Sequence, residues 1–254
     1  MPNIAILTRR ITLLALLALV PLHVSAAAAP PTVDNSIYAG LLAKYVHNGV
    51  VDYKGFQSEE KQLDQYLAYL GTIVPSTLSR DGQMAFYINL YNASTIKLIL
   101  TAYPGIKSIK DLGGFFTSPW EKEFVVLDGR KVSLDFIEHS ILRPQFQDPR
   151  IHFAVNCASK SCPPLLSEPY VGSRLNAQLD QVTTAFINNP KDTYIRGNTL
   201  YVSPIFKWYR EDFKNGVRAF VEKYARDGLK KEIAARGSNL DISYLDYDWS
   251  LNGH

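Results

Sequence analysis

The sequence contains few cysteines, with only two among 254 residues, and it lacks the spacings that mark common metal sites. Two cysteines cannot build the several bridges of a small disulfide-held domain or a four-cysteine zinc site. Neither a Cys-x-x-Cys pair nor a His-Glu-x-x-His run occurs. We therefore expect no bound metal and no cofactor, and we expect a hydrophobic core to hold the fold together.

Long hydrophobic runs are also absent, except at the amino terminus. Arg9 and Arg10 precede an apolar run at 11–20, and small residues follow at 24–26. This run is too short to span a membrane and has the layout of a cleaved secretory signal. We expect residues 1–26 to be a signal peptide, the mature protein to be periplasmic or secreted, and no transmembrane segment to remain after cleavage.

An excess of either charge is missing as well. The signal segment contains two arginines and no acidic residue, so the 27 basic and 24 acidic residues of the chain become 25 and 24 without it. No block of lysine and arginine occurs, which argues against nucleic-acid binding. The length suits one core, and we expect a flexible lead at 27–33 and a single, monomeric globular domain at 34–254.

Hydrophobic periodicity predicts an α+β fold in which several helices pack around a small mixed β-sheet. The longest helical pattern starts at Ser79 and continues to Ile99, and it is apolar enough to be the central helix of the core. Glycine-containing turns at 128–129 and 197–198 predict two hairpins. Further helices are expected at 35–47, 59–71, 134–142, 176–188, 217–225 and 229–235, and the aromatic segment 242–252 is expected to return to the core as a strand.

Both cysteines and one histidine fall within residues 150–164. The apolar run at 151–155 is bounded by turn residues, which predicts a buried central strand with Cys157 at its carboxyl end. Loops at the carboxyl ends of strands often carry reactive groups. We therefore expect the functional site to lie at this loop.

Five separated segments have a recognisable sequence pattern. They are Phe-Tyr-Ile-Asn-Leu-Tyr-Asn-Ala at 86–93 and the stretches 133–143, 150–164, 205–213 and 247–252. In these segments the chain resembles the family catalogued as domain of unknown function 547. The resemblance covers most of the mature chain and implies a domain type without an established reaction. Some members join this domain to a glutaredoxin-like module, which is a family-level indication of thiol chemistry.

A cysteine-dependent hydrolase or acyltransferase is the first interpretation of these residues. Such an enzyme needs a thiolate, a base, a group that orients the base, and donors for the oxyanion. Cys157 is the candidate nucleophile, His139 the candidate base and Glu138 a group that can orient it. His152 precedes Cys157 by five positions, an odd separation that points the two side chains to opposite faces of a strand, so we expect His152 to be a core residue.

Two asparagines and three other side chains complete the candidate site. Asn89 and Asn92 share a face of the long helix, where asparagine is an unfavourable residue. Either they satisfy backbone groups of a neighbouring loop, or one amide holds a catalytic side chain or the oxyanion. Arg143 and Arg150 can hold an acidic group of a substrate or form salt bridges, and Trp120 can line the substrate cleft.

Two alternatives use the same residues differently. In an oxidising compartment Cys157 and Cys162 can form a structural disulfide, and the protein is then a non-catalytic binding domain for a cell-envelope ligand. The aromatic residues of its cleft would be Trp120, Trp208, Tyr209 and Trp249. A short, strained bridge can instead belong to a thiol–disulfide redox protein, although four intervening residues differ from the two of thioredoxin-like sites. The substrate, whether a small molecule, a peptide or a cell-envelope component, stays open.

Overall fold

The structure, a computed structural model, describes residues 29–114 and 117–253. The predicted signal peptide at 1–26 lies outside these residues, as do the first two positions of the predicted lead. In the described part of the chain, no helix combines the length and the apolar character that crossing a membrane requires. Many helices are combined with small sheets, which confirms the predicted α+β class.

The longest helix, α4 (Arg80–Leu100), lies at the centre of the core, as predicted. The Ser79 side chain caps it by accepting a hydrogen bond from the backbone N–H of Gly82, and every residue at 84–96 is buried. Buried residues occupy all sides of this helix, which is typical of a helix enclosed by other elements. α4 therefore serves as the scaffold for its neighbours.

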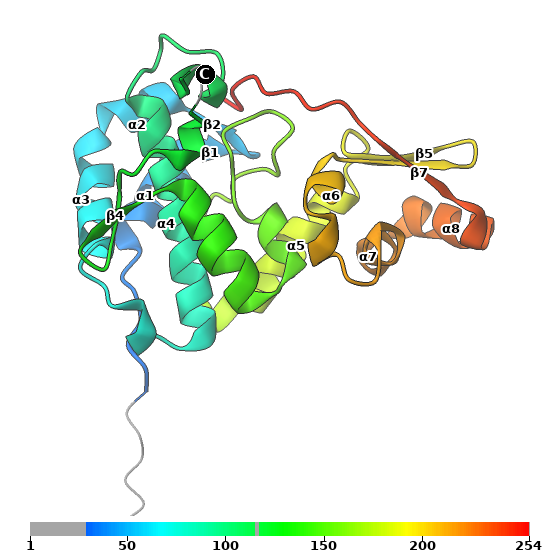
Figure 1. Cartoon of the computed structure of the whole chain (residues 1–254), viewed down its shortest axis with the longest axis horizontal. Coiled ribbons are helices and arrows are strands. Elements are labelled where there is room, and N and C mark those ends of the chain that lie inside the picture. The colour runs from blue at the N-terminus through cyan, green and yellow to red at the C-terminus, as the bar shows by residue number, and fades with distance from the viewer. Residues whose placement is uncertain (1–28, 115–116, 254) are drawn as a thin grey trace, which may run out of the picture.

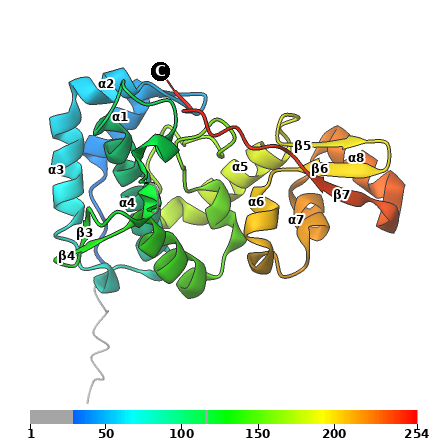
Figure 2. The same cartoon turned by 45° about the horizontal axis from the view of Figure 1, so that its top comes forward.

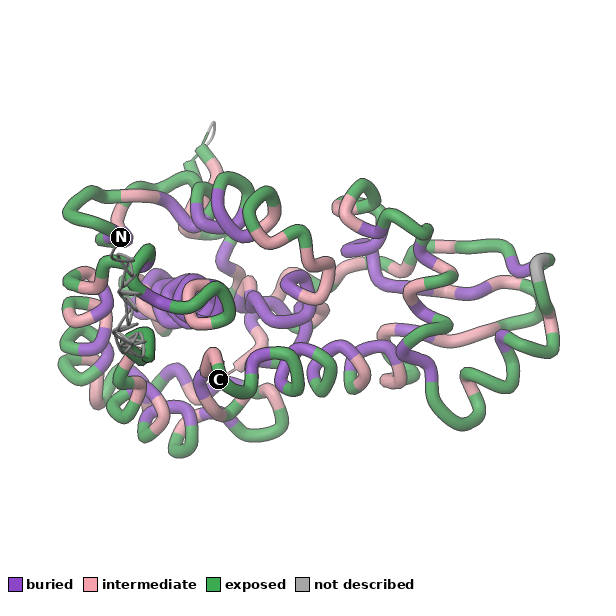
Figure 3. Tube along the Cα trace, turned by 90° about the horizontal axis from the view of Figure 1, so that it is seen from below, coloured by how far each residue is buried: buried purple, intermediate pink, exposed green. Residues whose placement is uncertain are grey.

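Helices pack against α4 from several directions (Figure 1). α2 (Tyr53–Ser58) and α3 (Glu60–Leu70) contact it directly, and α1 (Ser36–Tyr45) packs against α3. The π-helix η4 (Phe136–Phe146) and α5 (Leu175–Ile187) contact it elsewhere. In Figure 3 the buried residues follow the inner faces of the helices, and the exposed residues follow their outer turns.

The remaining helices are short. α6 (Ile205–Trp208), α7 (Val217–Tyr224) and α8 (Asp227–Arg236) follow one another in the second half of the chain. The other helical turns are 3₁₀: η1 (Pro75–Thr77), η2 (Ile109–Leu112), η3 (Pro119–Glu121), η5 (Pro149–Phe153), η6 (Gly172–Arg174), η7 (Arg210–Asp212) and η8 (Gly237–Asn239).

The strands are short, and both predicted hairpins are present. β3 (Val125–Leu127) pairs with β4 (Arg130–Val132), and β5 (Thr193–Arg196) pairs with β6 (Thr199–Val202), both antiparallel. β6 also pairs with β7 (Asp241–Tyr244) in parallel, so this sheet is mixed. It lies beside α8 at one end of the molecule (Figure 1). β1 (Val46–His47) and β2 (Val50–Val51) form another antiparallel pair.

After β7 the chain returns across the helices to the loop that carries the cysteines, and Figure 2 shows this return as the red segment. Leu251 forms an isolated bridge with Ser159. The backbone N–H of Lys160 donates to the Ser250 carbonyl at 2.8 Å. The predicted return of segment 242–252 to the core is confirmed, and its regular strand is β7.

The predicted strand at 151–155 is wrong, because this stretch begins inside the 3₁₀ helix η5 and continues as a turn. Pro149 occupies the first turn of η5, and the Asp148 side chain accepts a hydrogen bond from the backbone N–H of Arg150 at 3.0 Å. Both are start signals of a helix. A short apolar run does not distinguish a buried strand from a buried helical turn, so these flanking residues decide the backbone conformation.

Candidate active site

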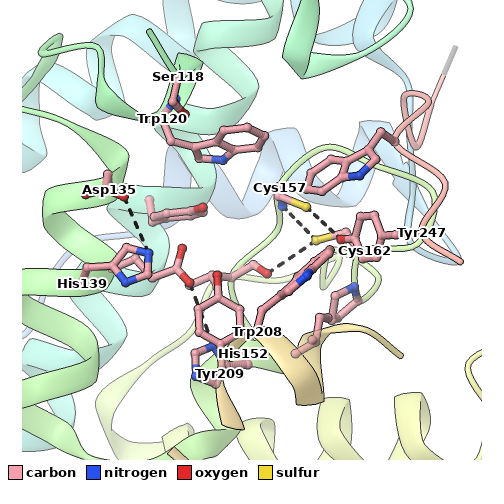
Figure 4. A pocket seen from close by; sticks show the side chains of 16 residues that line it. Ser118, Trp120, Asp135, His139, His152, Cys157, Cys162, Trp208, Tyr209 and Tyr247 are labelled. Atoms are coloured by element: carbon pink, nitrogen blue, oxygen red, sulfur yellow. Dashed lines mark hydrogen bonds and ion pairs between the residues drawn. The ribbon is translucent and has the colours of Figure 1, made fainter. Parts of the chain in front are cut away.

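A cavity of about 230 Å³ opens beside the cysteines and gathers residues from widely separated parts of the chain (Figure 4). We call it the thiol cavity. It includes four of the predicted site residues, namely Cys157, His139, Glu138 and Trp120, together with Cys162. Among the described residues, its wall consists of Tyr91, Ser118, Trp120, Asp135, Glu138, His139, His152, Val155, Cys157, Cys162, Pro163, Ile205, Trp208, Tyr209, Tyr247 and Trp249.

The two asparagines of α4 hold neighbouring loops in place. Asn92 donates to the Ala154 carbonyl at 2.9 Å and accepts from the backbone N–H of Asn156 at 2.8 Å. Asn89 makes the same two kinds of hydrogen bond with the carbonyl and the N–H of Tyr170, at 2.7 and 2.9 Å. Both side chains thus satisfy buried backbone groups, the first of the two readings of this pair, and neither lines the thiol cavity within the described residues.

Asn156 closes the loop around Cys157. Its side chain accepts a hydrogen bond from the backbone N–H of Ala158 at 3.0 Å and donates to the Pro163 carbonyl at 2.8 Å. Ala158 has a φ of 59°, a left-handed conformation that is unfavourable for a residue with a Cβ. The hydrogen bonds of Asn156 therefore hold the chain in a sharp turn directly after the thiol.

The Cys157 thiol lies beside two hydroxyl groups and the second cysteine. Its Sγ is 3.2 Å from the hydroxyl of Ser159 and 3.2 Å from the hydroxyl of Tyr247, which the returning carboxyl-terminal segment supplies. The backbone N–H of Cys157 donates to Sγ of Cys162 at 2.9 Å. The two cysteines are free thiols, with Cys157 partly exposed and Cys162 buried.

These neighbours give the two thiols opposite acidities. The hydrogen bond from Cys162 has the largest effect on Cys157 and, together with those from Ser159 and Tyr247, it outweighs burial and lowers the pKa of Cys157 to about 7. Burial raises the pKa of Cys162 well above its ordinary value. Cys157 is therefore the thiol that carries the thiolate near neutral pH.

His139 lies on the opposite side of the thiol cavity from Cys157 (Figure 4). The Arg143 guanidinium, which can only donate, is 2.7 Å from Nδ1 of His139, so Nδ1 accepts. Nε2 is 3.6 Å from the carboxylate of Asp135, which makes Asp135 the acidic residue that orients this ring. The described residues that hydrogen-bond to Sγ of Cys157 do not include a histidine.

His152 also lines the thiol cavity, which differs from its predicted orientation away from Cys157. The prediction assumed alternating strand faces, and η5 does not alternate. His152 is buried, with Nε2 2.7 Å from Oδ2 of Asp212 and its ring stacked on Tyr209 at a centroid distance of 3.9 Å. The prediction that His152 is buried in the core is therefore correct, whereas its separation from the site is not.

Glu138 has different neighbours from those expected of a group that orients His139. Only 5% of its surface is exposed, burial and the nearby Glu138 carboxylate raise the pKa of Tyr209, and Oε1 of Glu138 is 3.9 Å from Nδ1 of His152. That Nδ1 is buried and has no hydrogen-bond partner among the described residues. Glu138 and His152 thus form a buried acid–base pair at the cavity wall.

The two predicted substrate-binding arginines are engaged in ion pairs. Arg143 binds Asp212, with Nε 2.7 Å from Oδ2, and also pairs with Glu211. Arg150 binds Asp148 at 2.6 Å and Asp180 at 2.9 Å. Neither belongs to the described wall of the thiol cavity, so their salt bridges, and not a substrate, account for their positions.

Sequence reasoning missed Asp135, Ser159, Asp212 and Tyr247 as parts of this site. Asp212 and Tyr247 lie in stretches 205–213 and 247–252, for which the sequence predicts a family resemblance and cleft tryptophans but no role for these two residues. No spacing rule connects them to Cys157, because 90 residues separate Cys157 from Tyr247. Within residues 29–114 and 117–253, no three histidine, cysteine, aspartate or glutamate side chains converge as metal ligands would.

Comparison with known proteins gives one family relationship. No curated protein and no solved structure matches the chain. Residues 75–187, from η1 to the end of α5, match the family described as "Protein of unknown function, DUF547". The matched stretch contains Asn92, His139 and both cysteines, whereas Asp212 and Tyr247 lie beyond it. Over residues 75–187, the chain is therefore similar to the DUF547 family.

Proposed function

We propose that the protein is a hydrolase or acyltransferase in which Cys157 is the nucleophile. The observation that carries this proposal is the Cys157 side chain, which is a free thiol, reaches the thiol cavity and has a pKa lowered to about 7. The thiolate is the reactive form of cysteine, so this pKa gives a substantial reactive fraction at neutral pH.

The reaction proceeds in two steps, formation of a thioester on Cys157 and its resolution by an acceptor. The Cys157 thiolate attacks the acyl carbon of an ester, thioester or amide, a C–S bond forms, and the leaving group departs with a proton supplied by the protein. Water or a second acceptor then attacks the resulting thioester, gives its proton to the protein and releases the thiolate. The transfer needs no oxidant or cofactor.

His139 is the proposed carrier of that proton. Its Nδ1 is occupied by Arg143, so the mobile proton belongs on Nε2, beside Asp135 at 3.6 Å. Because the hydrogen bonds around Cys157 already stabilise its thiolate, the base does not have to touch the thiol. A histidine across the thiol cavity can instead serve the leaving group and the acceptor.

Alkylation and turnover together test the proposal. Free thiols are counted by mass after iodoacetamide treatment, and activated esters and peptides are assayed with the wild type, Cys157→Ser and His139→Gln. The expected result is a rapidly alkylated Cys157, no turnover in Cys157→Ser and a strongly reduced turnover in His139→Gln. A fully oxidised, unreactive pair of cysteines, or unchanged turnover in Cys157→Ser, would overturn the thiol mechanism. Failure of both forms to turn over any ester or peptide would favour the binding domain.

A thiol–disulfide redox protein is the second candidate, supported by the opposite acidities of the two thiols. Cys157 is partly exposed with a lowered pKa, whereas Cys162 is buried with a raised pKa and lies next to it. In this reaction the Cys157 thiolate attacks a substrate disulfide and expels one thiol. Cys162 then attacks the mixed disulfide, releases the second thiol and leaves the pair oxidised, so a dithiol reductant must reset it.

Replacement of Cys162 separates the two candidates. Acyl transfer requires only Cys157, so Cys162→Ala should keep turnover of activated esters, at a reduced rate. Disulfide reduction requires both thiols, and the same variant should accumulate the mixed disulfide without completing the reaction. Export to the cell envelope is part of both proposals, and cell fractionation of the full chain and of a form lacking residues 2–26 tests it.

A further inference from the structure

Aromatic rings form a large part of the thiol cavity. All three tryptophans of the chain line it, together with Tyr91, Tyr209 and Tyr247. The Trp249 ring touches the others, with centroid distances of 5.8 Å to Trp120, 5.7 Å to Trp208 and 4.5 Å to Tyr247. In Figure 4 Trp120 and Trp208 lie on opposite sides of the space in front of Cys157. Aromatic rings would therefore contact a ligand in the cavity on several sides.

Apart from the imidazoles of His139 and His152, the ionisable groups of the described wall are acidic. Asp135 and Glu138 contribute carboxylates, and the described wall contains no lysine or arginine. Glu138 is only 5% exposed, and the single ion-pair partner within 4 Å in the described structure is the imidazole of His152 at 3.9 Å, which is not a permanent cation. A buried carboxylate without a fixed cation is costly, and a bound cation relieves that cost.

One aromatic ring of the cavity wall, that of Trp249, already contacts an ammonium group of the protein. The Lys110 Nζ lies 3.7 Å from the centroid of the Trp249 ring, although Lys110 is not part of the described wall. Ring faces bind cations through their negative electrostatic potential, and tryptophan does so best. Rings and carboxylates thus favour the same kind of ligand inside the cavity.

We infer that the thiol cavity binds a primary alkylammonium group of its substrate, with the rings around the charge and Glu138 and Asp135 accepting its N–H hydrogens. A primary ammonium fits this set better than a quaternary one, because carboxylates can accept hydrogen bonds only from an N–H donor. The inference names the substrate class of the proposed acyl transfer and to that extent rests on it. An ammonium group at this position is either the charged end of the acyl donor or, after it gives one proton to His139, the amine acceptor that attacks the thioester, forms an amide and releases the Cys157 thiolate.

Tryptophan fluorescence reports binding directly, since every tryptophan of the chain lines the cavity. Cys157→Ser protein is titrated at neutral pH and constant ionic strength with n-butylammonium, with n-butanol as the neutral isostere and tetramethylammonium as the cation without N–H groups. We expect saturable binding of n-butylammonium, about tenfold tighter than that of either comparison probe.

Substitutions of the two carboxylates test whether they bind the ammonium group. Glu138→Gln keeps the size of the side chain and its contact with Tyr209 but removes the charge, and it should weaken n-butylammonium binding about tenfold. Asp135→Asn should weaken it several-fold, and its half-exposed side chain keeps the test valid if Glu138→Gln does not fold. Asp128→Asn, which removes the same charge at an exposed turn outside the described wall, should leave binding unchanged.

Three results would overturn the inference. They are equal binding of n-butanol or tetramethylammonium, unchanged affinity in both carboxylate variants, and saturable binding of a neutral sugar such as N-acetylglucosamine in place of the ammonium. The binding test is separate from the proposed function, because it uses protein without the nucleophile. Binding that persists while Cys157 proves inert overturns only the thiol mechanism, and turnover without ammonium binding overturns only this inference.

Discussion

The imidazole Nε2 of His152 lies 2.7 Å from Oδ2 of Asp212, although 60 residues separate them in the sequence. The same carboxylate oxygen also accepts a hydrogen bond from Nε of Arg143 at 2.7 Å. This junction joins η4, η5 and η7 beneath the thiol cavity. Because Tyr209 stacks on the His152 ring, loss of the junction would disturb the cavity wall as well as stability.

Replacement of Asp212 by asparagine should therefore destabilise the fold in a pH-dependent way. Burial acts to raise the pKa of Asp212, but hydrogen bonds from His152 and Arg143 outweigh it and hold that pKa well below the ordinary 3.8. A lowered folded-state pKa gives stability that is fully present above the unfolded-state pKa and is lost as the pH falls through the folded-state pKa. At neutral pH we expect Asp212→Asn to lose about 2 to 4 kcal/mol of unfolding free energy.

Urea unfolding at several pH values measures this effect. The difference between the wild type and Asp212→Asn should be constant from pH 6 to 8. It should begin to shrink below about pH 4, where the Asp212 carboxylate of the unfolded wild type takes up a proton, and should shrink further as the pH falls toward the lower folded-state pKa. Asp128→Asn, at an exposed turn, is the control and should follow the wild type. A difference that stays the same down to the acid limit would show that the carboxylate charge is not the stabilising feature.

The acidity of Cys157 should depend on its hydrogen-bond donors. The iodoacetamide rate should rise with pH and reach half its maximum near pH 7, the value to which those donors lower the pKa of Cys157. Cys162→Ala removes the largest contribution and Tyr247→Phe removes a smaller one, so each should raise the pKa and slow alkylation several-fold at about pH 6.

Stopped-flow alkylation across pH provides the measurement, with Tyr194→Phe as the matched control because Tyr194 lies on β5, outside the described cavity wall. If the alkylation rate of the wild type reached half its maximum near the pKa of a free cysteine, that result would contradict the stabilisation of the thiolate by these hydrogen bonds. A midpoint that Cys162→Ala leaves unchanged would assign the lowered pKa to other groups.

Features with local causes could be predicted from the sequence. The cap at Ser79 and the apolar pattern that follows it specify α4, and the Asp128-Gly129 turn specifies the β3–β4 hairpin. The choice of Cys157 and His139 for one site was also local, because each residue type has few representatives in the chain. Both lie in the thiol cavity.

The remaining features depend on contacts between distant segments, which carry no local signal. The apolar run at 151–155 fits either a strand or a helical turn, and only the capping by Asp148 together with packing selects η5. Because a strand was predicted there, His152 was predicted to point away from Cys157, whereas both residues line the thiol cavity. Tyr247 reaches Cys157 only because the carboxyl-terminal segment returns across the molecule and bonds to the loop around Ser159. Neither the conformation of η5 nor the contact between Tyr247 and Cys157 follows from residue spacing.

Asn89 and Asn92 form a matched pair for separating stability from reactivity. Both are buried on α4, and each side chain bonds one carbonyl and one N–H of a loop. Replacement by alanine should cost about 2 to 4 kcal/mol in either case, because two buried backbone groups lose their partners. Only Asn92→Ala should also slow the alkylation of Cys157, since Asn92 alone of the two holds the loop next to the thiol.

Thermal or urea unfolding measures the loss of stability in Asn89→Ala and Asn92→Ala. The iodoacetamide rate at neutral pH measures the reactivity of Cys157 in each variant. The rate is measured well below the unfolding transition of each variant, so that exposed thiols of unfolded molecules do not contribute. Equal slowing in Asn89→Ala would mean that general loosening of α4, and not the Asn92 contacts, controls the thiol.

Two glycines with nearly equal backbone angles test how tightly the β1–β2 turn supports the cysteine loop. Gly49 has a φ of 79°, and an added Cβ would lie 2.2 Å from Cβ of Pro164, whereas Gly129 has a φ of 71° and open space around it. Alanine at Gly129 should cost about 1 kcal/mol, the strain of a left-handed residue. Alanine at Gly49 carries the same strain and must also displace Pro164, so it should cost about 1 to 3 kcal/mol more, as overpacking does.

The displaced Pro164 should also change the chemistry, because the neighbouring Pro163 lines the thiol cavity and accepts the hydrogen bond that Asn156 donates. We therefore expect Gly49→Ala to alter the alkylation rate of Cys157 and Gly129→Ala to leave it unchanged. Urea unfolding and iodoacetamide kinetics on the two variants measure both effects. Equal stability losses would mean that the β1–β2 turn moves aside without strain, and an unaltered rate in Gly49→Ala would mean that the loop holds Cys157 without support from this turn.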